Sequence, residues 1–283
     1  MVQSVNRYRA PSDVNQQVKL SKLIAEQQAL VSGRSRVATP SDDPKAWLEA
    51  ANISRFQSDE EAWVNNLSRA DTRASQAEAS LDNIVNGLIR TRELLLQANS
   101  GTISPTDPAV LAIEVDGIAT DFVDALGQRD NFGGQLFGTG PRIRMPIGDA
   151  RYVDAAPNLA EVQDNIDIGG GVTASLGDIM ADTAASIRTG TGADRAVQLT
   201  ALDGAIDRMT QLLTRQGVVK GSITSAREEL TQSKLSLAER KSQLVDADVA
   251  EALTRLQTLL TNLQATQAVY AKISQQSLID YLR

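Results

Sequence analysis

The sequence contains no cysteine and no histidine. These absences exclude disulfides, thiolate nucleophiles, zinc sites built from cysteine and histidine, and catalytic triads that depend on an imidazole. Proton transfer in an enzyme of this composition would depend on carboxylates, lysine, tyrosine or hydroxyl groups. No glycine-rich phosphate loop of the Gly-Lys-Ser/Thr type is present either. We therefore expect no catalytic site, no cofactor and no metal.

Aromatic residues are also scarce, with two Trp, four Tyr and four Phe in 283 residues. So few rings leave little material for a base-stacking surface. Acidic residues outnumber basic ones by 35 to 28, which gives a net charge of −7. Because binding to nucleic acid requires a basic face, we expect no nucleic-acid partner.

Long apolar segments are missing as well. No run reaches the roughly 18 apolar residues that a membrane-spanning helix needs. The first thirty residues are polar and of mixed charge, without the apolar core of a secretory signal. We expect no membrane insertion, and a protein that is either cytoplasmic or exported without a cleaved signal peptide.

What the chain does contain is helical periodicity, first in its N-terminal half. An apolar stripe predicts a helix from about residue 14 to residue 31, ended by Gly33. Asp43 and Pro44 are the residue types preferred at an N-cap and at the first helical position, so a second helix is expected from there to about Asn99, with Gly101 as its stop.

This second helix contains a heptad seam in its C-terminal half. Thr91 fills one apolar slot of the seam, whose other members are Leu81, Ile84, Leu88 and Leu95. The start signal recurs at Asp107 and Pro108, which predicts a third helix ending near Gly127.

Residues 131–180 differ in kind, because short alternating runs are separated by Gly, Pro and Asn. Gly169–Gly171 predicts a tight turn, and helix is expected to resume near Asp182. The predicted strands are short and lie at residues 142–147, 150–153 and 162–168.

The C-terminal part returns to helix. A long tract runs from about residue 196 to residue 243, weakened locally by Gly217 and Gly221. Asp248 and Glu251 have the spacing of a capping box and predict the start of the last helix. Its apolar residues step by three and four and predict one seam, formed by Val249, Leu253, Leu256, Leu260, Leu263 and Tyr270.

Together these patterns predict a mainly α fold with minor β structure. The first and last helices are expected to pair with each other, or with another chain, in a long helical rod or coiled coil. We expect three parts. Residues 1–40 with 247–283 form the terminal helices, residues 41–137 with 181–246 form a central helical bundle, and residues 138–180 form a small β-rich outer insertion.

Three segments, taken in order, resemble the flagellin superfamily. They are VSGRSRVATPSDDP at residues 31–44, NFGGQLFG at residues 131–138 and DADVAEALTRLQ at residues 246–257. The turn at residues 40–44 and the ending SLIDYL at residues 277–282 are more similar to the hook-associated branch of the superfamily than to filament-forming flagellins.

The resemblance implies a non-enzymatic structural protein of the bacterial flagellum that joins hook to filament by helical self-assembly. It implies export through the flagellar type III channel without signal cleavage, and therefore an extracellular location. The implied partners are further copies of the chain, the neighbouring hook, junction and filament proteins, and an export chaperone on the C-terminal helix. Two alternatives stay open, namely a short flagellin that forms the filament itself and a cytoplasmic coiled-coil scaffold.

The residues expected to carry assembly are apolar positions on the two terminal helices. They are Leu20, Leu23, Leu30, Leu253, Leu256, Leu260, Leu263, Tyr270, Ile273, Leu278 and Leu282.

Two pairs of acidic residues and two arginines permit more than one interpretation. Asp42/Asp43 and Asp246/Asp248 would suit metal or glycosidase chemistry, but both pairs stand at predicted helix starts, where acidic residues are favoured as caps. Arg34 and Arg36 would form either salt bridges between subunits or a solvated turn.

Overall fold

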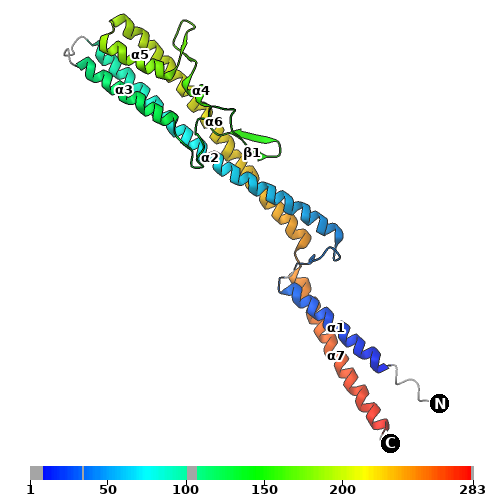
Figure 1. Cartoon of the computed structure of the whole chain (residues 1–283). Helices are drawn as coiled ribbons and strands as arrows, with labels where there is room; N and C mark the ends of the chain where they lie inside the picture. Colours follow the sequence, from blue (N-terminus) through cyan, green and yellow to red (C-terminus); the bar gives the residue numbers. More distant parts are fainter. Residues whose placement is uncertain (1–8, 34, 101–106, 282–283) are drawn as a thin grey trace. The chain divides into compact units, whose positions relative to one another are not determined.

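The computed structural model describes the backbone of residues 9–33, 35–100 and 107–281, and the side chains of residues 15–33, 35–100 and 108–272. Helices dominate this part of the chain (Figure 1), so the prediction of a mainly α fold with minor β structure is confirmed. The helices are α1 (Arg9–Val31), α2 (Pro44–Asn99), α3 (Asp107–Leu126), α4 (Leu159–Gln163), α5 (Leu176–Thr189), α6 (Gly192–Val245) and α7 (Val249–Tyr281). The strands are β1 (Arg144–Gly148), β2 (Arg151–Asp154), β3 (Ile166–Asp167) and β4 (Thr173–Ala174).

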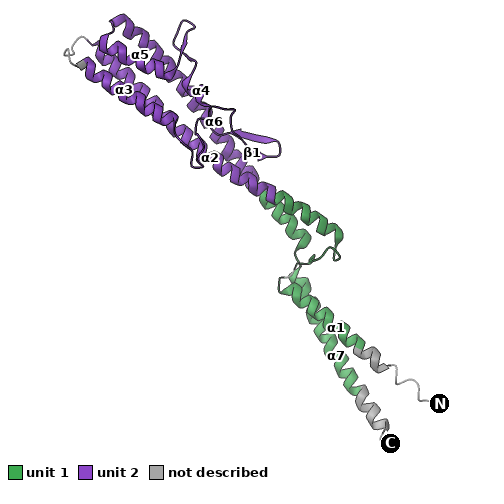
Figure 2. Cartoon of the chain, in the orientation of Figure 1, with its two compact units in different colours: residues 1–57, 234–283 green, residues 58–233 purple. Residues whose placement is uncertain are grey.

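The chain divides into two compact units, which Figure 2 colours separately. Unit 1 consists of residues 1–57 and 234–283, and unit 2 consists of residues 58–233. The three-part division expected from the sequence stays a prediction.

The long helix α2 begins and ends where its sequence signals predict. The carboxylate of Asp43 accepts a hydrogen bond from the backbone N–H of Ala46 at 3.0 Å, as an N-cap does. Pro44 occupies the first helical position, where an N–H would have no partner within the helix. Helix α2 ends at Asn99, and Gly101, expected to follow as its stop, lies outside the described residues.

The core of unit 2 forms around the predicted heptad seam of α2. Leu81, Ile84, Leu88 and Leu95 are fully buried. Thr91 is also fully buried, and its hydroxyl donates to the carbonyl of Gly87 at 2.8 Å, so its polar group is satisfied inside the helix. The apolar residues that pack on this seam from other segments include Val115, Phe122, Phe137, Ile179, Ile187, Leu202 and Met209.

The antiparallel hairpin of β1 and β2 packs on a second apolar cluster of unit 2. Its inward residues, Ile147 and Val153, are buried together with Leu67 of α2 and Ile223 of α6. The outward residue Tyr152 is half exposed, as the alternation of a strand requires.

The turn at Gly169–Gly171 joins β3 to β4, and its three glycines have φ values of 95°, 66° and 78°. Residues with a side chain rarely adopt such values, so the prediction of a tight turn here is confirmed, with a physical reason for the glycines.

The predicted strand at residues 162–168 is largely wrong. Helix α4 covers its first residues, and only Ile166–Asp167 pairs as a strand. The carboxylate of Glu161 accepts a hydrogen bond from the backbone N–H of Asn158 at 3.2 Å, which stabilises the first turn of this helix. A five-residue helix is too short to produce a readable period.

The predicted restart of helix near Asp182 is also wrong, because α5 begins at Leu176. Ser175 is the N-cap, and its hydroxyl accepts a hydrogen bond from the N–H of Asp178 at 3.1 Å. Ser175 and Asp178 are three residues apart, which is the spacing of an N-cap and an acidic residue in the first helical turn. This spacing is the sequence signal for the start of α5.

Candidate assembly surfaces

In unit 1, α1 and α7 pack against each other (Figure 1), and the end of α1 lies beside the start of α7, so the pair is antiparallel. Ile24 of α1 and Ala252 of α7 are buried in the contact, at 8% and 4% exposure. Half-buried residues at helical spacing continue the seam on both helices, namely Gln17, Leu20, Gln27, Val31, Leu256, Leu259, Leu263 and Thr266. The first helix therefore pairs with the last, one of the two arrangements expected from the sequence.

The predicted single seam of α7 is in fact divided between two stripes. Leu256 and Leu263 belong to the contact with α1. Val249, Leu253 and Leu260 lie beside that contact, with 50%, 45% and 40% of their surfaces exposed. The sequence could not separate the stripes because both repeat at three and four residues, and only the position of α1 distinguishes them.

The predicted assembly residues divide in the same way. Leu20, Leu30, Leu256 and Leu263 are partly covered within the chain. The more exposed residues are Leu23, Leu253, Leu260 and Tyr270. The side chains of Ile273 and Leu278 and the whole of Leu282 lie outside the described residues.

The loop after α1 is joined to the end of α6 by hydrogen bonds. The N–H of Arg36 donates to the carbonyl of Val245 at 2.8 Å, and its guanidinium donates to the carbonyl of Leu244 at 2.6 Å. The hydroxyl of Ser35 also donates to Val245, at 2.9 Å. Arg36 thus satisfies helix-end carbonyls of its own chain, while Arg34 lies outside the described residues.

The paired acidic residues act locally as caps and turn acceptors. Asp248 accepts a hydrogen bond from the N–H of Glu251 at 3.0 Å and so caps α7. Asp42 accepts hydrogen bonds from the N–H groups of Ala38 and Thr39, at 3.0 and 2.7 Å. Asp246 accepts one from the hydroxyl of Ser242 at 2.6 Å. Among the residues that the structure describes, no group of three or more acidic side chains is suited to hold a metal ion.

The capping box predicted at the start of α7 is formed only in its first half. The carboxylate of Glu251 pairs with Arg255 at 2.7 Å, one turn further along the helix. At the start of α2, the hydrogen bond from Ala46 and the charge of Arg36, 3.6 Å away, hold the pKa of Asp43 below its ordinary value. This carboxylate is therefore ionised at neutral pH and favours the positive end of the helix dipole.

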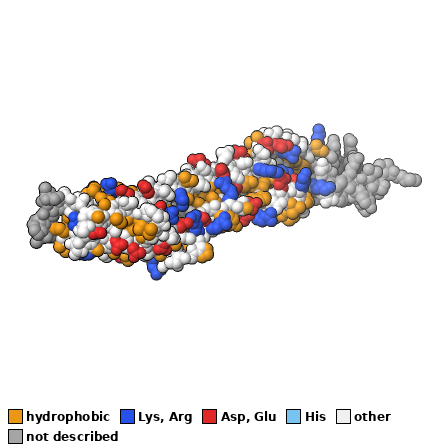
Figure 3. Space-filling model, turned by 90° about the horizontal axis from the view of Figure 1, so that it is seen from above, with side chains coloured by type: hydrophobic (Ala, Val, Ile, Leu, Met, Phe, Trp, Pro, Cys, Tyr) orange, Lys and Arg blue, Asp and Glu red, His pale blue; other side chains and the backbone are white. Residues whose placement is uncertain are grey.

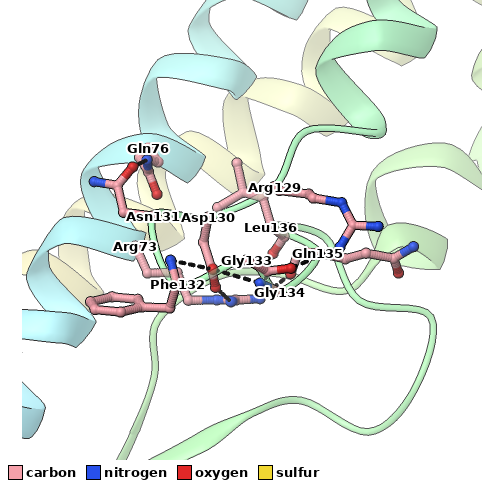
Figure 4. Close-up of polar contacts among 10 residues, drawn as sticks. All are labelled: Arg73, Gln76, Arg129, Asp130, Asn131, Phe132, Gly133, Gly134, Gln135 and Leu136. Carbon is pink, nitrogen blue, oxygen red and sulfur yellow. Dashed lines mark hydrogen bonds and ion pairs between the residues drawn. The ribbon is translucent and has the colours of Figure 1, made fainter.

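A polar cluster in unit 2 holds the glycine-rich segment at residues 129–136 against α2 (Figure 4). The buried guanidinium of Arg73 on α2 pairs with the buried carboxylate of Asp130 and donates to the carbonyls of Gln135 and Leu136, both at 2.7 Å. Asp130 in turn accepts hydrogen bonds from the N–H groups of Phe132 and Gly134, both at 2.9 Å.

Sequence reasoning missed Arg73. The available signal was its place beside Ala70, Ala74 and Ala77, small residues that line the buried face of α2. An arginine on such a face requires a partner, since an unpaired buried charge is costly. The partner lies 57 residues away, at Asp130.

The C-terminal helices match a known protein family. Residues 199–282, which include most of α6 and all of α7, match the family model described as the bacterial flagellin C-terminal helical region. The resemblance to the flagellin superfamily is confirmed.

Two curated relatives align with the chain. Flagellar hook-associated protein 3 of Escherichia coli is 25% identical over 136 residues, and that of Salmonella typhimurium is 28% identical over 107 residues. The alignments cover 47% and 38% of this chain, and 43% and 34% of the two relatives. The chain thus matches less than half the length of each.

Solved structures share the fold at low sequence identity. A hook-associated protein from Vibrio parahaemolyticus has a TM-score of 0.65 at 18% identity, covering 72% of this chain and 100% of its own. Hook-associated protein 3 from Legionella pneumophila has a TM-score of 0.62 at 12% identity, covering 69% of this chain and 98% of its own. In the part of the chain that the structure describes, none of the helices is long and apolar enough to span a membrane.

Proposed function

We propose that this chain is a structural subunit of the bacterial flagellum that joins the hook to the filament through self-assembly of its terminal helices. The observation that carries the proposal is the similarity to two proteins named flagellar hook-associated protein 3. A structural neighbour named as a flagellar junction protein, from Legionella pneumophila, has a TM-score of 0.56 and supports the same fold.

The exposed leucines of the α1–α7 pair support self-assembly as the mode of action. Leu23, Leu253 and Leu260 are each at least 40% exposed, although they lie beside a formed helix contact. Exposed apolar stripes of this kind mark protein interfaces. In the proposed assembly these residues contact neighbouring copies and the adjoining hook and filament proteins.

The proposal includes export and location. The chain would leave the cell through the flagellar type III channel without signal cleavage and remain outside the cell as part of the flagellum. An export chaperone would cover the apolar surface of α7 until export, because an exposed apolar stripe promotes aggregation of the free chain. The subunit has a structural role and no catalytic one.

Deletion of the gene tests the proposal directly. Cells without the protein are expected to build hooks but to release filament protein into the medium, because nothing joins the two parts. Complementation with the intact gene should restore filaments seen by electron microscopy. Full-length filaments on the deletion strain would exclude a junction role, and loss of filament protein itself would indicate a flagellin.

A further inference from the structure

The chain passes twice between the α1–α7 pair and the adjoining ends of α2 and α6, and both crossings lie within unit 1. Residues 32–43 join α1 to α2 and form the first crossing, and residues 246–248 join α6 to α7 and form the second. Each residue has only two soft backbone dihedral angles, so few angles of the second crossing decide the direction in which α7 leaves α6. A contact between the crossings at the end of α6 therefore also restrains α7.

The first crossing supplies such a contact through two polar side chains. Arg36 donates from its backbone N–H to the carbonyl of Val245 at 2.8 Å, and from its guanidinium to the carbonyl of Leu244 at 2.6 Å. Ser35 donates from its hydroxyl to Val245 at 2.9 Å. The last carbonyls of a helix have no partner within that helix, so they are free to bind donors from another segment. At the end of α6 these donors come from the other crossing.

The guanidinium of Arg36 also reaches the start of α2. It lies 3.6 Å from the carboxylate of Asp43, which caps that helix. The guanidinium thus stands at the negative end of the α6 dipole, and the carboxylate stands at the positive end of the α2 dipole, so both charges are favourably placed. A planar guanidinium with several donors can bridge two helix ends in this way, whereas the compact ammonium of a lysine cannot reproduce its geometry.

The next residue, Val37, holds the first crossing by packing. Its side chain is buried and lines a cavity of about 240 Å³ together with Trp47 of α2 and Val245 of α6. Apolar packing has no preferred direction, but hydrogen bonds do. The packing of Val37 therefore keeps the loop near the helix ends, and the donors of Arg36 and Ser35 decide its orientation there.

From these contacts we infer that Arg36 is a positioning residue. It latches the two crossings together and holds the α1–α7 pair in one orientation relative to the adjoining ends of α2 and α6. Without this latch each crossing would bend about its own backbone angles. The inference rests on the proposed function, because a joint that bends freely could not hold a filament on its hook under load.

Distance measurements between spin labels test the latch, because the chain has no cysteine of its own to be labelled. The labels are attached at Lys22→Cys in α1 and at Glu239→Cys in α6, which are both exposed positions. Double electron–electron resonance should give a narrow distance distribution for this chain. The distribution should become broad when Arg36→Met and Ser35→Ala are added, because methionine keeps an unbranched apolar stem but has no donor.

Hydrogen exchange gives a second readout of the same latch. The backbone amide of residue 36 donates to Val245, so its exchange reports how often the two crossings separate. Arg36→Met should accelerate this exchange about tenfold or more, because the hydrogen bond of a charged group contributes enough free energy for that factor. Arg36→Lys keeps the charge but not the planar fork, and it should give an intermediate rate.

The matched control is Arg240→Met. Arg240 of α6 donates from Nε to Glu49 of α2 at 3.0 Å, so this variant breaks an arginine contact between the same two helices but outside the crossings. Both the narrow distance distribution and the exchange rate of the residue 36 amide should be unchanged. Equal broadening by the control would overturn the inference, because the orientation would then depend on general stability and not on the latch.

Cells that carry Ser35→Ala with Arg36→Met as the sole copy connect the latch to function. They should export the subunit but lose filaments under shear that the filaments of wild-type and Arg240→Met cells withstand. A broad distance distribution in the labelled wild-type chain, or a narrow one in the variant, would overturn the inference and leave the proposed function intact. Filaments of the variant that withstand shear would do the same. Absence of the wild-type protein from flagella would overturn the proposed function, and with it the inference.

Discussion

At the scale of single residues, the cap of α2 depends on an ionised carboxylate. The pKa of Asp43 is lowered in the folded chain by the hydrogen bond from Ala46 and by Arg36. A lowered folded pKa means that the carboxylate stabilises the fold above its unfolded value of 3.8, and that this stabilisation is lost as the pH falls through the folded value.

Asp43→Asn should therefore lower the thermal stability of the chain more at pH 7 than at about pH 3, because the stabilisation by the ionised carboxylate declines once the pH falls below the unfolded pKa of 3.8. Asparagine keeps the cap geometry but not the charge, so the variant isolates the electrostatic contribution. Thermal unfolding followed by circular dichroism at the two pH values measures the effect. An equal loss of stability at both pH values would contradict a stabilising charge on Asp43.

The buried pair of Arg73 and Asp130 gives a larger expected effect. Asp130→Ala leaves the guanidinium buried without its counter-ion and should lower the free energy of unfolding by about 3–5 kcal/mol. Arg73→Met in the same chain removes that charge and should restore part of the loss. Urea unfolding of unit 2 measures both variants.

The control for this pair is Asp203→Ala, which breaks an exposed ion pair with Arg92 and should cost below about 1 kcal/mol. Equal losses from Asp130→Ala and Asp203→Ala would contradict a special role for the buried cluster.

At the scale of elements, replacing either of two glycines of α6 by alanine should change the stability of the chain, but in opposite directions. A Cβ at Gly204 would lie 2.0 Å from the carbonyl oxygen of Asp167, so Gly204→Ala should destabilise the chain by about 1–3 kcal/mol through the forced backbone shift. A Cβ at Gly217 would meet nothing within 4 Å, so Gly217→Ala should stabilise the chain by about 0.5–1 kcal/mol through helix propensity. Denaturant unfolding of both variants is the measurement, and a stabilising effect of Gly204→Ala would contradict the close packing of α6 on β3.

The terminal helix pair should open more readily than the core of unit 2. The α1–α7 contact buries Ile24 and Ala252, whereas the α2 seam buries a continuous row that includes Leu81, Ile84 and Leu88. Fewer buried apolar contacts mean a lower free energy of local opening. In hydrogen exchange on the free subunit, amides of α1 and α7 should exchange before those of residues 81–95, and the reverse order would contradict this ranking.

Many of the helix starts and turns could be predicted because they depend on residues that are close together in the sequence. The Asp-Pro starts of α2 and α3 and the glycine turn at residues 169–171 depend on a few adjacent residues, and each appears where expected. The start of α5 was misplaced because Ser175 gives only a weak cap signal within a region dominated by turns.

The surfaces could be predicted less completely. The division of the α7 leucines depends on where α1 lies, and the Arg73–Asp130 contact depends on the return of the chain after α3. Both contacts depend on the tertiary fold, so no pattern of neighbouring residues predicts them.

At the scale of the whole molecule, assembly should depend on exposed rather than covered leucines. Leu260→Asp should leave the helix content of the free subunit unchanged, because Leu260 is already 40% exposed, but should abolish attachment of filaments to hooks. Thr261→Asp, on a different side of α7, is the matched control and should have no effect on attachment. Normal swimming by cells that carry Leu260→Asp would contradict an assembly role for this surface.

The proposed junction role places the protein between hook and filament. Immunogold labelling of intact flagella with an antibody to residues 142–154 tests this location, because this hairpin exposes Arg144 and Tyr152 in the subunit. On the face drawn in Figure 3, acidic, basic and apolar side chains are intermixed. One cluster of gold at the boundary of hook and filament is expected. Label along the whole filament would identify the chain as a flagellin, and absence of label from flagella would contradict a flagellar role.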